Sequence, residues 1–503
     1  MLSAVDSCML VGLDVRRVEV QADIANGEPK FALVGLAATS VKEARERVRS
    51  AIRNSGLEFP TRRLTVNLAP AELRKQGSLL DLPIAVAIAL ARAERPAPPR
   101  SAFVGELALD GAVCHVDGVL VAARGLKRLG YLRIFVPAAD AAEASLVDGI
   151  EVIPCTTLVA LVEQLVGIRP IEPAPARSPA VGPPDLALEH DLAEVHGQEE
   201  GKRALELAAA GGHHLLFTGP PGAGKTMLAA CLPGILPPLQ LNEALEVAQV
   251  RSLLGELPAS GPLDWNRPFR APHHGVSMAG LIGGGGGVAL PGEISRAHNG
   301  VLFLDELAEF QSPVLQALRQ PLEAGRVTIT RSGGSVVYPA RFTLAAATNP
   351  CPCGWAGDQR RRCRCTPPAI DAYRRRLSGP LLDRVDLQVS VRRVDLATLA
   401  FEPQGEPSGT VRRRVQEARD RQISRQGCLN AELRPARLRS IAGLADHPRR
   451  VLERWADRRA LTARGFHRAW RVARTCADLD GSEAIAERHV LEALGFRLQE
   501  VAA

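Results

Sequence analysis

The 503-residue sequence has no apolar stretch long enough to cross a membrane. Its longest apolar run, Leu82 to Ala91, is far shorter than the roughly 20 residues that a spanning helix needs, so we predict a buried core helix and no membrane partner. The first 20 residues also lack a basic start followed by an apolar segment, and Asp6 and Asp14 interrupt them. We therefore expect no secretory signal and a cytoplasmic protein.

The composition lacks the marks of a disordered or disulfide-stapled chain. Hydrophobic residues make up 46% and charged residues 23%, which is typical of soluble globular proteins. Ten cysteines in a chain of this length, without a secretory start, do not indicate a disulfide scaffold. The chain is too long for one hydrophobic core, so we expect two or three domains.

An excess of acidic residues is absent too, because the net charge is +7. Arginine dominates the basic residues and is concentrated in one short stretch that holds Arg360, Arg361, Arg362, Arg364, Arg374, Arg375 and Arg376. Such a stretch fits a polyanionic partner, and a solvated basic face explains the charge equally well.

What the sequence does contain is a phosphate-binding loop between an apolar strand, residues 215–218, and a helix. The pattern GxxxxGK[ST] is formed by Gly219, Pro220, Pro221, Gly222, Ala223, Gly224, Lys225 and Thr226. Its glycines let backbone N–H groups surround phosphate oxygens, and the helix N-terminus adds a positive dipole end. We predict that the chain binds a nucleoside triphosphate, with Lys225 on the β- and γ-phosphates and Thr226 on Mg²⁺.

Two further apolar strands end in polar residues. Gly300 to Leu304 is followed by Asp305 and Glu306, and Phe342 to Ala347 is followed by Thr348 and Asn349. Ligands bind beyond the carboxyl ends of parallel strands, so these side chains should lie beside Lys225. We expect Asp305 to hold Mg²⁺, Glu306 to polarise the attacking water, and Asn349 to orient that water or contact the γ-phosphate.

The chain divides into segments of different character, and we predict a multidomain α/β protein. Residues 1–168 alternate strand and helix patterns, such as a strand at 63–67 and a helix at 81–93, and residues 169–184 form a Pro/Ala-rich linker. Residues 185–403 hold the phosphate loop, and residues 404–503 are helical and arginine-rich. The helices predicted in this last part span 410–426, 449–460, 466–478 and 483–498.

Four cysteines follow Asn349 closely, in the pattern CxC-x₉-CxC. Four thiolates can complete a closed tetrahedral zinc site, and free thiols on a surface loop are the alternative. The residues concerned are Cys351, Cys353, Cys363 and Cys365.

Two glycine-containing segments lie on either side of Asp305 and Glu306 in the sequence. Residues 327–338 alternate on both sides of Gly333-Gly334, which predicts a β-hairpin. Residues 276–290 contain five consecutive glycines, which predict a mobile loop because glycine loses much entropy when it is fixed. A purely structural hairpin and linker remain an alternative for both.

These motifs together resemble an AAA+ ATPase. Residues 191–198 (DLAEVHGQ), ahead of the first strand of this part, add to the AAA+ resemblance. More narrowly, three strings resemble the magnesium-chelatase-like ATPases of the YifB/ComM family: residues 269–274 (FRAPHH), 291–300 (PGEISRAHNG) and 378–386 (SGPLLDRVD). The resemblance runs nearly end to end. It implies a central P-loop αβα domain and a C-terminal helical lid.

The resemblance also implies a homo-oligomer, usually a hexameric ring, with ATP and Mg²⁺ between subunits. Arg384 matches the arginine finger that related minichromosome-maintenance helicases carry, and Arg464 matches their lid arginine, although Arg468, Arg471 and Arg474 lie nearby. In similar ATPases the hairpin projects into the central pore, which would present Arg331 to DNA.

Residues 1–168 resemble the Lon-protease-like (S5-type) α/β fold without its catalytic dyad. Leu79 and Leu120 stand where that family has its serine and lysine, and a dyad cannot operate without either member. The resemblance favours a DNA translocase or branch-migration motor in recombination or natural transformation. A chelatase-type motor acting on a protein is the alternative, disfavoured because dedicated subunits of that kind lack such a domain, and an ATP-dependent protease is third.

Overall fold

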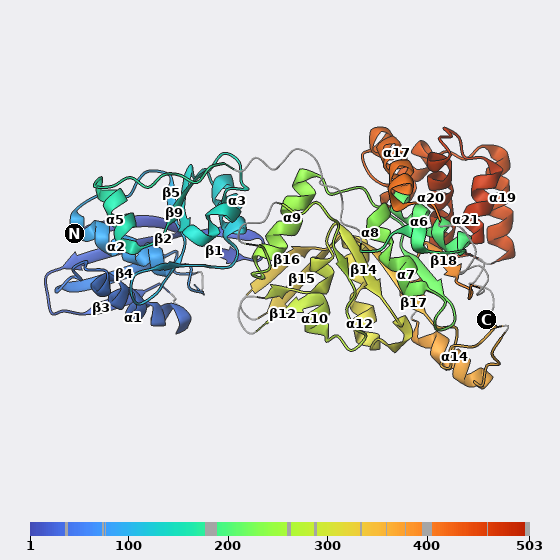
Figure 1. Ribbon diagram of the computed structural model, residues 1–503, viewed down its shortest axis with the longest axis horizontal. Helices are drawn as coiled ribbons and strands as arrows, with labels where there is room; N and C mark the ends of the chain where they lie inside the picture. Colours follow the sequence, from blue (N-terminus) through green and yellow to red (C-terminus); the bar gives the residue numbers. More distant parts are fainter. Residues whose placement is uncertain are drawn as a thin grey trace.

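The computed structural model has three regions that follow one another along its longest axis in chain order (Figure 1). They are an N-terminal α/β region, a central α/β region and a C-terminal helical region. The structure describes residues 1–35, 39–72, 75, 77–176, 189–258, 263–285, 289–331, 334–358, 360–377, 379–394, 405–459 and 461–497. The second half of the predicted linker, residues 177–184, and the predicted boundary near residue 404 lie outside these ranges.

The N-terminal region is built on a seven-stranded sheet in the order β3-β4-β2-β1-β5-β8-β9. The pairs β1/β2 and β2/β4 are antiparallel, and the remaining neighbours are parallel. The strands are β1 (Leu2–Val11), β2 (Asp14–Ala25), β3 (Phe31–Val34), β4 (Arg63–Ala69), β5 (Ser101–Phe103), β8 (Arg133–Pro137) and β9 (Glu151–Cys155), with β6 (Glu106–Leu107) and β7 (Val113–Cys114) forming a separate hairpin.

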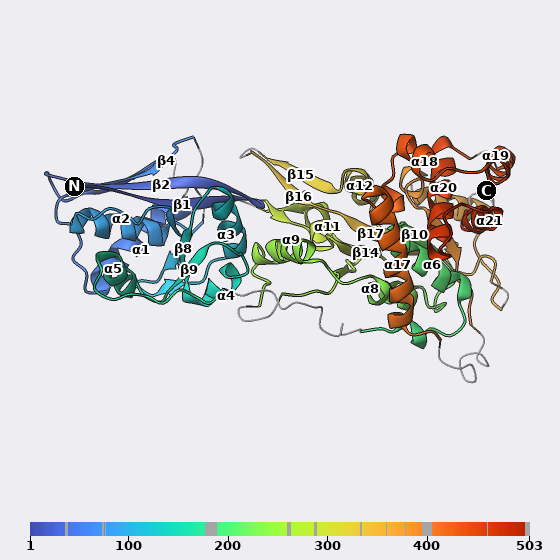
Figure 2. The ribbon, with the colours of Figure 1, turned by 90° about the horizontal axis from the view of Figure 1, so that it is seen from above.

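Helices cover one face of this sheet, as Figure 2 shows for β1, β2 and β4. The predicted core helix is α2 (Asp81–Ala93), and its apolar run from Leu82 is almost completely buried. The prediction of a buried helix there is confirmed. The other helices of this region are α1 (Thr39–Asn54), α3 (Val119–Arg128), α4 (Ala141–Ala144) and α5 (Leu158–Val166).

The central region contains a five-stranded parallel sheet in the order β11-β14-β17-β10-β18. Strand β14 is buried at all five positions, as expected of a parallel strand covered on both faces. Both apolar strands predicted downstream of the phosphate loop are present. The strands are β10 (Leu215–Thr218), β11 (Phe269–Arg270), β14 (Gly300–Leu304), β17 (Phe342–Thr348) and β18 (Leu387–Ser390).

Ten helices of the described residues surround this sheet, several of them only one turn long. They are α6 (Glu199–Gly211), α7 (Lys225–Ala230), α8 (Leu232–Ile235), α9 (Leu241–Ser252), α10 (Met278–Ile282), α11 (Glu293–Arg296), α12 (Ser312–Ala317), α13 (Arg319–Ala324), α14 (Pro367–Arg376) and α15 (Gly379–Leu382).

The predicted hairpin is present as β15 (Arg326–Arg331) and β16 (Gly334–Pro339), with Arg331 opposite Gly334. Its turn residues 332 and 333 lie outside the described ranges. The prediction of a loop throughout residues 276–290 is wrong in part. Helix α10 begins after Ser277, whose hydroxyl accepts the N–H of Gly280, and β12 (Gly283–Gly284) pairs with β13 (Leu290–Pro291). Backbone pairing fixes the first glycines, and residues 286–288 are outside the described ranges.

The C-terminal region consists of helices packed on α6, as Figure 1 shows for α17, α20 and α21. One buried cluster contains Leu205 of α6, Val415 of α17 and Val472 of α20, so this region shares a hydrophobic core with the central sheet. The four predicted helices are present, and a fifth, α18, was not predicted. The helices are α17 (Ser408–Gln426), α18 (Pro435–Ile441), α19 (Asp446–Arg458), α20 (Ala463–Leu479) and α21 (Glu487–Gly495).

The N-terminal region docks on α9 of the central region. The N–H of Gly118 donates to the carbonyl of Ser252 at 3.0 Å, and the Ser252 hydroxyl donates to buried Glu143 at 2.6 Å. Arg124 on α3 donates to Gln249 on α9 at 2.5 Å. Polar contacts thus join the two α/β regions directly.

Candidate active site

The loop between β10 and α7 wraps around the Lys225 side chain. Its ammonium donates to the carbonyls of Gly219 at 2.7 Å and Pro220 at 3.0 Å, and to Oδ1 of Asn349 at 3.1 Å. Only 8% of the residue is exposed. Burial lowers the pKa of Lys225, and the nearby carboxylates Asp305 and Glu306 oppose that shift. The ammonium is therefore held between the phosphate loop, the start of α7 and the end of β17.

Glycine is required in this loop for two different reasons. Gly222 and Gly224 have φ of 73° and 90°, a region that side chains other than glycine rarely adopt. At Gly219 a Cβ atom would lie 2.2 Å from the carbonyl oxygen of Val391, which follows β18. The loop can thus adopt its concave shape and still pack against the end of the neighbouring strand.

Thr226 and Asp305 meet across the same edge of the sheet. The Thr226 hydroxyl donates to Oδ2 of Asp305 at 2.8 Å, and Oδ1 of Asp305 accepts the N–H of Glu306 at 2.9 Å. A hydroxyl and a carboxylate side by side are hard oxygen ligands of the kind that Mg²⁺ prefers. These residues therefore fit a magnesium ion.

A cleft of about 470 Å³ brings the predicted residues together. Its lining consists of Pro221, Gly222, Ala223, Gly224, Lys225, Thr226, Met227, Asp305, Glu306, Thr348 and Asn349. Neither Arg384 nor Arg464 is among these described lining residues. Arg384 is paired with Glu323 of α13, Arg464 is exposed at the start of α20, and Arg331 lies at the end of β15.

His274 lies beside the cleft and was not assigned a role from the sequence. Its Nδ1 is 3.5 Å from Oε2 of Glu306, and its ring contacts those of His273 and Phe310. The segment 269–274 was singled out only for its resemblance to a family. His274 follows β11, which runs parallel to β14, and so lies at the same sheet edge as Glu306; this position is the signal that could have identified it.

The four clustered cysteines converge to one point. Their Sγ atoms all lie within 4.8 Å of one another, and the separations are 3.5 Å for Cys351–Cys353, 3.7 Å for Cys351–Cys363 and 3.6 Å for Cys353–Cys363. None of the four is in a disulfide. Zinc–sulfur bonds of about 2.3 Å in a tetrahedron place the sulfurs about 3.8 Å apart, so the cluster can hold a metal ion.

Comparison with known proteins finds relatives along the full length. The chain is 43% identical to the protein YifB of Escherichia coli over 501 residues, which cover 99% of this chain and 97% of that protein. It is also 43% identical to the competence protein ComM of Haemophilus influenzae over 510 residues, with the same coverage. The chain belongs to the YifB/ComM family of magnesium-chelatase-like proteins.

Three sequence profiles divide this YifB/ComM-family chain much as its fold does. The profile described as magnesium chelatase, subunit ChlI, matches residues 191–399, and its C-terminal counterpart matches residues 405–497. Another, described as subunit ChlI of Mg-chelatase, matches residues 20–140. The magnesium-chelatase subunit ChlI of Euglena gracilis is 26% identical over 186 residues, 31% of this chain and 51% of that protein. Family membership indicates an ATPase that uses ATP and Mg²⁺.

Two of the lid arginines near Arg464 are engaged in buried ion pairs. Arg468 of α20 donates to Asp386 at 2.8 Å, and Arg474 contacts Asp478 at 2.9 Å. The first pair joins α20 to the start of β18, and the second lies within α20, so both arginines are already engaged in the fold. None of the described helices is long and apolar enough to span a bilayer.

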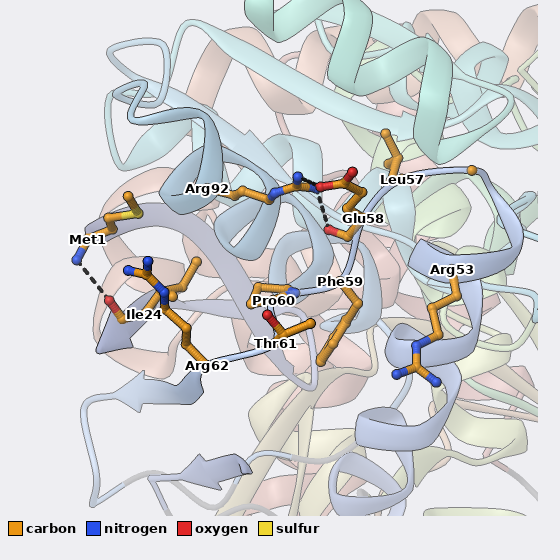
Figure 3. A pocket seen from close by; sticks show the side chains of 11 residues that line it. Met1, Ile24, Arg53, Leu57, Glu58, Phe59, Pro60, Thr61, Arg62 and Arg92 are labelled. Carbon is orange, nitrogen blue, oxygen red and sulfur yellow. Dashed lines mark hydrogen bonds and ion pairs between the residues drawn. The ribbon is translucent and has the colours of Figure 1, made fainter. Parts of the chain in front are cut away.

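A larger cavity, about 610 Å³, lies in the N-terminal region of this YifB/ComM-family chain, and Figure 3 shows its lining. Arg92 is paired there with Glu58, and the Arg53 guanidinium lies 5.8 Å from the Phe59 ring centre. The N-terminal amine donates to the carbonyl of Ile24 at 3.0 Å. Although this cavity is larger than the cleft, the cleft is the candidate active site, because the groups suited to phosphoryl transfer lie around Lys225.

Proposed function

We propose that this chain is a ring-forming AAA+ ATPase that couples ATP hydrolysis to translocation on DNA. The observation that carries the proposal is the convergence of Lys225, Thr226, Asp305, Glu306 and Asn349 in one cleft at the carboxyl edge of a parallel sheet. This arrangement supplies charge neutralisation, a base for water and a polar group to orient it, which hydrolysis of a triphosphate requires.

Each of these residues has a role in the proposal. The loop from Gly219 to Gly224 and Lys225 bind the phosphates, and Thr226 and Asp305 hold Mg²⁺. A bound Mg²⁺ ion supplies positive charge that offsets the charge of the phosphates. Glu306 takes a proton from the attacking water, and Asn349 orients that water or contacts the γ-phosphate.

The site is completed by a neighbouring subunit of a hexameric ring. Arg384 acts as the arginine finger in trans, because it does not line the cleft of its own subunit and a guanidinium matches phosphate geometry. The Arg384 side chain is 11% exposed and pairs with Glu323, so the finger would have to leave this pair to reach a phosphate of the neighbouring subunit. Arg464 is the lid arginine, supported by its exposure and by the ion pairs that engage Arg468 and Arg474.

DNA is the proposed substrate of the motor, and Arg331 on the β15–β16 hairpin is the residue proposed to contact it. Arg331 and Gly334 are both exposed at the described end of this two-stranded element. The exposed arginines Arg360, Arg361 and Arg362 add positive charge, and a similar protein carries the name competence protein ComM. Recombination or natural transformation is the proposed setting.

The proposed domains are residues 1–168, 169–184, 185–403 and 404–503, namely a Lon-protease-like domain, a linker, the ATPase core and the helical lid. Leu120 is fully buried, and its N–H donates to Glu143 at 2.8 Å. An apolar side chain there and at Leu79 supports a domain without peptidase activity.

We assign zinc to Cys351, Cys353, Cys363 and Cys365 as a structural metal. The sulfur separations near 3.6 Å support the assignment, as do the N–H groups of Ala356 and Cys365, which donate to the sulfurs of Cys351 and Cys363. Such outer hydrogen bonds stabilise thiolates around a metal.

The test is the ATPase rate of the full chain with and without single-stranded or forked DNA, across a salt series. Stimulation and binding that fall steeply with salt are expected, because phosphate contacts release counterions. Arg331→Ala should weaken both, and Arg326→Ala, on the same strand and also exposed, serves as the control. Absence of both stimulation and salt-dependent binding would contradict the DNA proposal.

A motor acting on a protein partner is the second candidate. The profile match of residues 20–140 to a chelatase subunit favours it, so the N-terminal domain alone does not separate the two. ATPase activity that DNA leaves unchanged would support this candidate.

A further inference from the structure

We propose that the four-cysteine segment, residues 351–365, braces the phosphate loop, so that nucleotide affinity depends on the metal it binds. The proposal rests on the proposed nucleotide site and goes beyond it, because it gives the metal an effect on ATP binding. Two contacts carry it.

The first contact is direct packing between the segment and the phosphate loop. Gly354 has φ of 82°, and a Cβ atom there would lie 2.6 Å from Cδ of Pro221. The N–H of Gly354 donates to the carbonyl of Cys351 at 2.9 Å. The backbone next to a metal ligand thus lies against the loop that surrounds the phosphates.

The second contact runs through Arg393, which follows β18. Its Nη2 donates to the carbonyl of Pro221 at 3.2 Å, and its guanidinium lies 4.6 Å from the centre of the Trp355 ring. Its Nε lies 3.9 Å from Oδ2 of Asp358, whose side chain is 6% exposed. Arg393 therefore touches the phosphate loop and the cysteine segment at once, and we assign it as a positioning residue.

The opposite side of the loop is held separately. The Gln198 amide donates to the carbonyls of Ala223 at 3.1 Å and Arg392 at 2.5 Å. The loop is therefore fixed between Gln198 and the cysteine segment. Since a shift of the loop misplaces several N–H donors together, loss of one brace should weaken nucleotide binding.

Metal is what gives the cysteine segment its shape. Four converging thiols form no disulfide, and each sulfur must be held close to three others that repel it when ionised. A bound ion removes that repulsion and closes the turn between residues 351 and 365. Removal of the ion should release Gly354 and Trp355 from Pro221 and Arg393.

The chain supplies a matched pair of arginines for the test. Arg361 also lies over Trp355, at 4.8 Å, but among the described residues it is Arg393 and not Arg361 that donates to Pro221 of the phosphate loop. Affinity for a fluorescent ATP analogue should fall about tenfold in Arg393→Ala, the loss expected for a hydrogen bond from a charged group, and less than about twofold in Arg361→Ala. Arg393→Lys, which keeps a cation and a donor, should recover part of the affinity.

The metal itself is tested on the full-length protein. We expect about one zinc per chain, a roughly tenfold loss of analogue affinity after a zinc-selective chelator in the presence of Mg²⁺, and recovery on adding Zn²⁺ alone. Absence of zinc, unchanged affinity after its removal, or equal losses in the two arginine variants would overturn the proposal. If the zinc-loaded protein binds no better than Lys225→Ala, the nucleotide site itself is wrong, which is a separate failure.

Discussion

At the scale of single residues, Glu306 is the one non-glycine residue among the described lining of the cleft whose backbone is left-handed, with φ of 50°. Residues other than glycine pay on the order of 1 to 3 kcal/mol for such a conformation, and it occurs mostly at functional sites. The conformation is supported by the Asp305 carboxylate, which accepts its N–H, and by the N–H of Glu309, which donates to its carbonyl at 2.7 Å. The fold thus tolerates an unfavourable backbone conformation that fixes the position of the Glu306 carboxylate.

Glu306→Gln should retain ATP binding and lose turnover. The amide keeps the shape of the side chain but cannot take a proton from water, so kcat should fall by about 100-fold or more. The measurement is the steady-state ATPase rate alongside nucleotide affinity. Glu309→Gln, a change to an exposed acid three residues along, is the control and should be close to wild type. Persistent hydrolysis in Glu306→Gln would show that another carboxylate is the base.

His274→Ala should reduce kcat modestly and leave KM unchanged. The imidazole is 3.5 Å from Glu306, and partly exposed pairs of this kind contribute about 0.2 to 1 kcal/mol, so we expect a roughly two- to fivefold loss. His273→Ala removes a ring that lies 3.9 Å from the His274 ring, centre to centre, while the ion pair of Glu306 within the described residues is with His274, so this change should affect kcat less. Equal rates for His274→Ala and wild type would show that the contact has no role in turnover.

At the scale of elements, Asp386 connects the start of β18 to α20. Its carboxylate accepts from Arg468 at 2.8 Å and from the N–H of His214 at 3.2 Å, and it is 3% exposed. Burial favours the neutral acid, but the Arg468 cation, together with the adjacent His213, outweighs it and holds the pKa of Asp386 well below its usual range. Loss of this carboxylate leaves the Arg468 cation without its partner.

Asp386→Asn should therefore lower the free energy of unfolding by about 3 kcal/mol at pH 7. The folded-state pKa is depressed, so this contribution is present above the unfolded value near 4 and is lost as pH falls below it. Urea unfolding at several pH values measures the difference in free energy of unfolding between the wild type and Asp386→Asn. This difference should become smaller in acid. Asp446→Asn, in an exposed pair with Arg449, should cost less than about 1 kcal/mol, and equal effects of the two substitutions would contradict the argument.

The elements around the cleft could be predicted because their signals are local. Buried parallel strands read as continuous apolar runs, and α2 matches its predicted range of 81–93. Helix α18 was missed since only Leu438 of its seven residues is buried, which leaves no apolar periodicity to detect. The contacts of Arg393 with Pro221 and Trp355 were also beyond prediction, because they join residues far apart in the sequence.

At the scale of the whole molecule, the proposed active site is shared between subunits. Lys225→Ala and Arg384→Ala should each be nearly inactive, but a mixture of equal amounts should regain about a quarter of the wild-type rate. In mixed rings an intact cleft of one variant meets the intact finger of the other. The measurement is the ATPase rate after the two proteins are mixed and allowed to exchange subunits.

A mixture of Lys225→Ala with Glu306→Gln is the matched control. Both residues line the same cleft, so no mixed arrangement combines an intact cleft from these two variants. No recovery is expected there. Recovery in neither mixture, with subunit exchange verified, would place Arg384 outside the site.

The turn between β1 and β2 bears directly on the hairpin that we assign to DNA. Gly12, with φ of 64°, lies so close to β16 that a Cβ atom would be 2.4 Å from Val336, and Figure 2 shows β15 and β16 beside this end of the N-terminal sheet. A displacement of β16 toward this turn would therefore be opposed by the N-terminal region as well as by the central one. If the hairpin moves along DNA as we propose, this contact would couple its movement to the N-terminal region, which would limit how far the hairpin can be displaced.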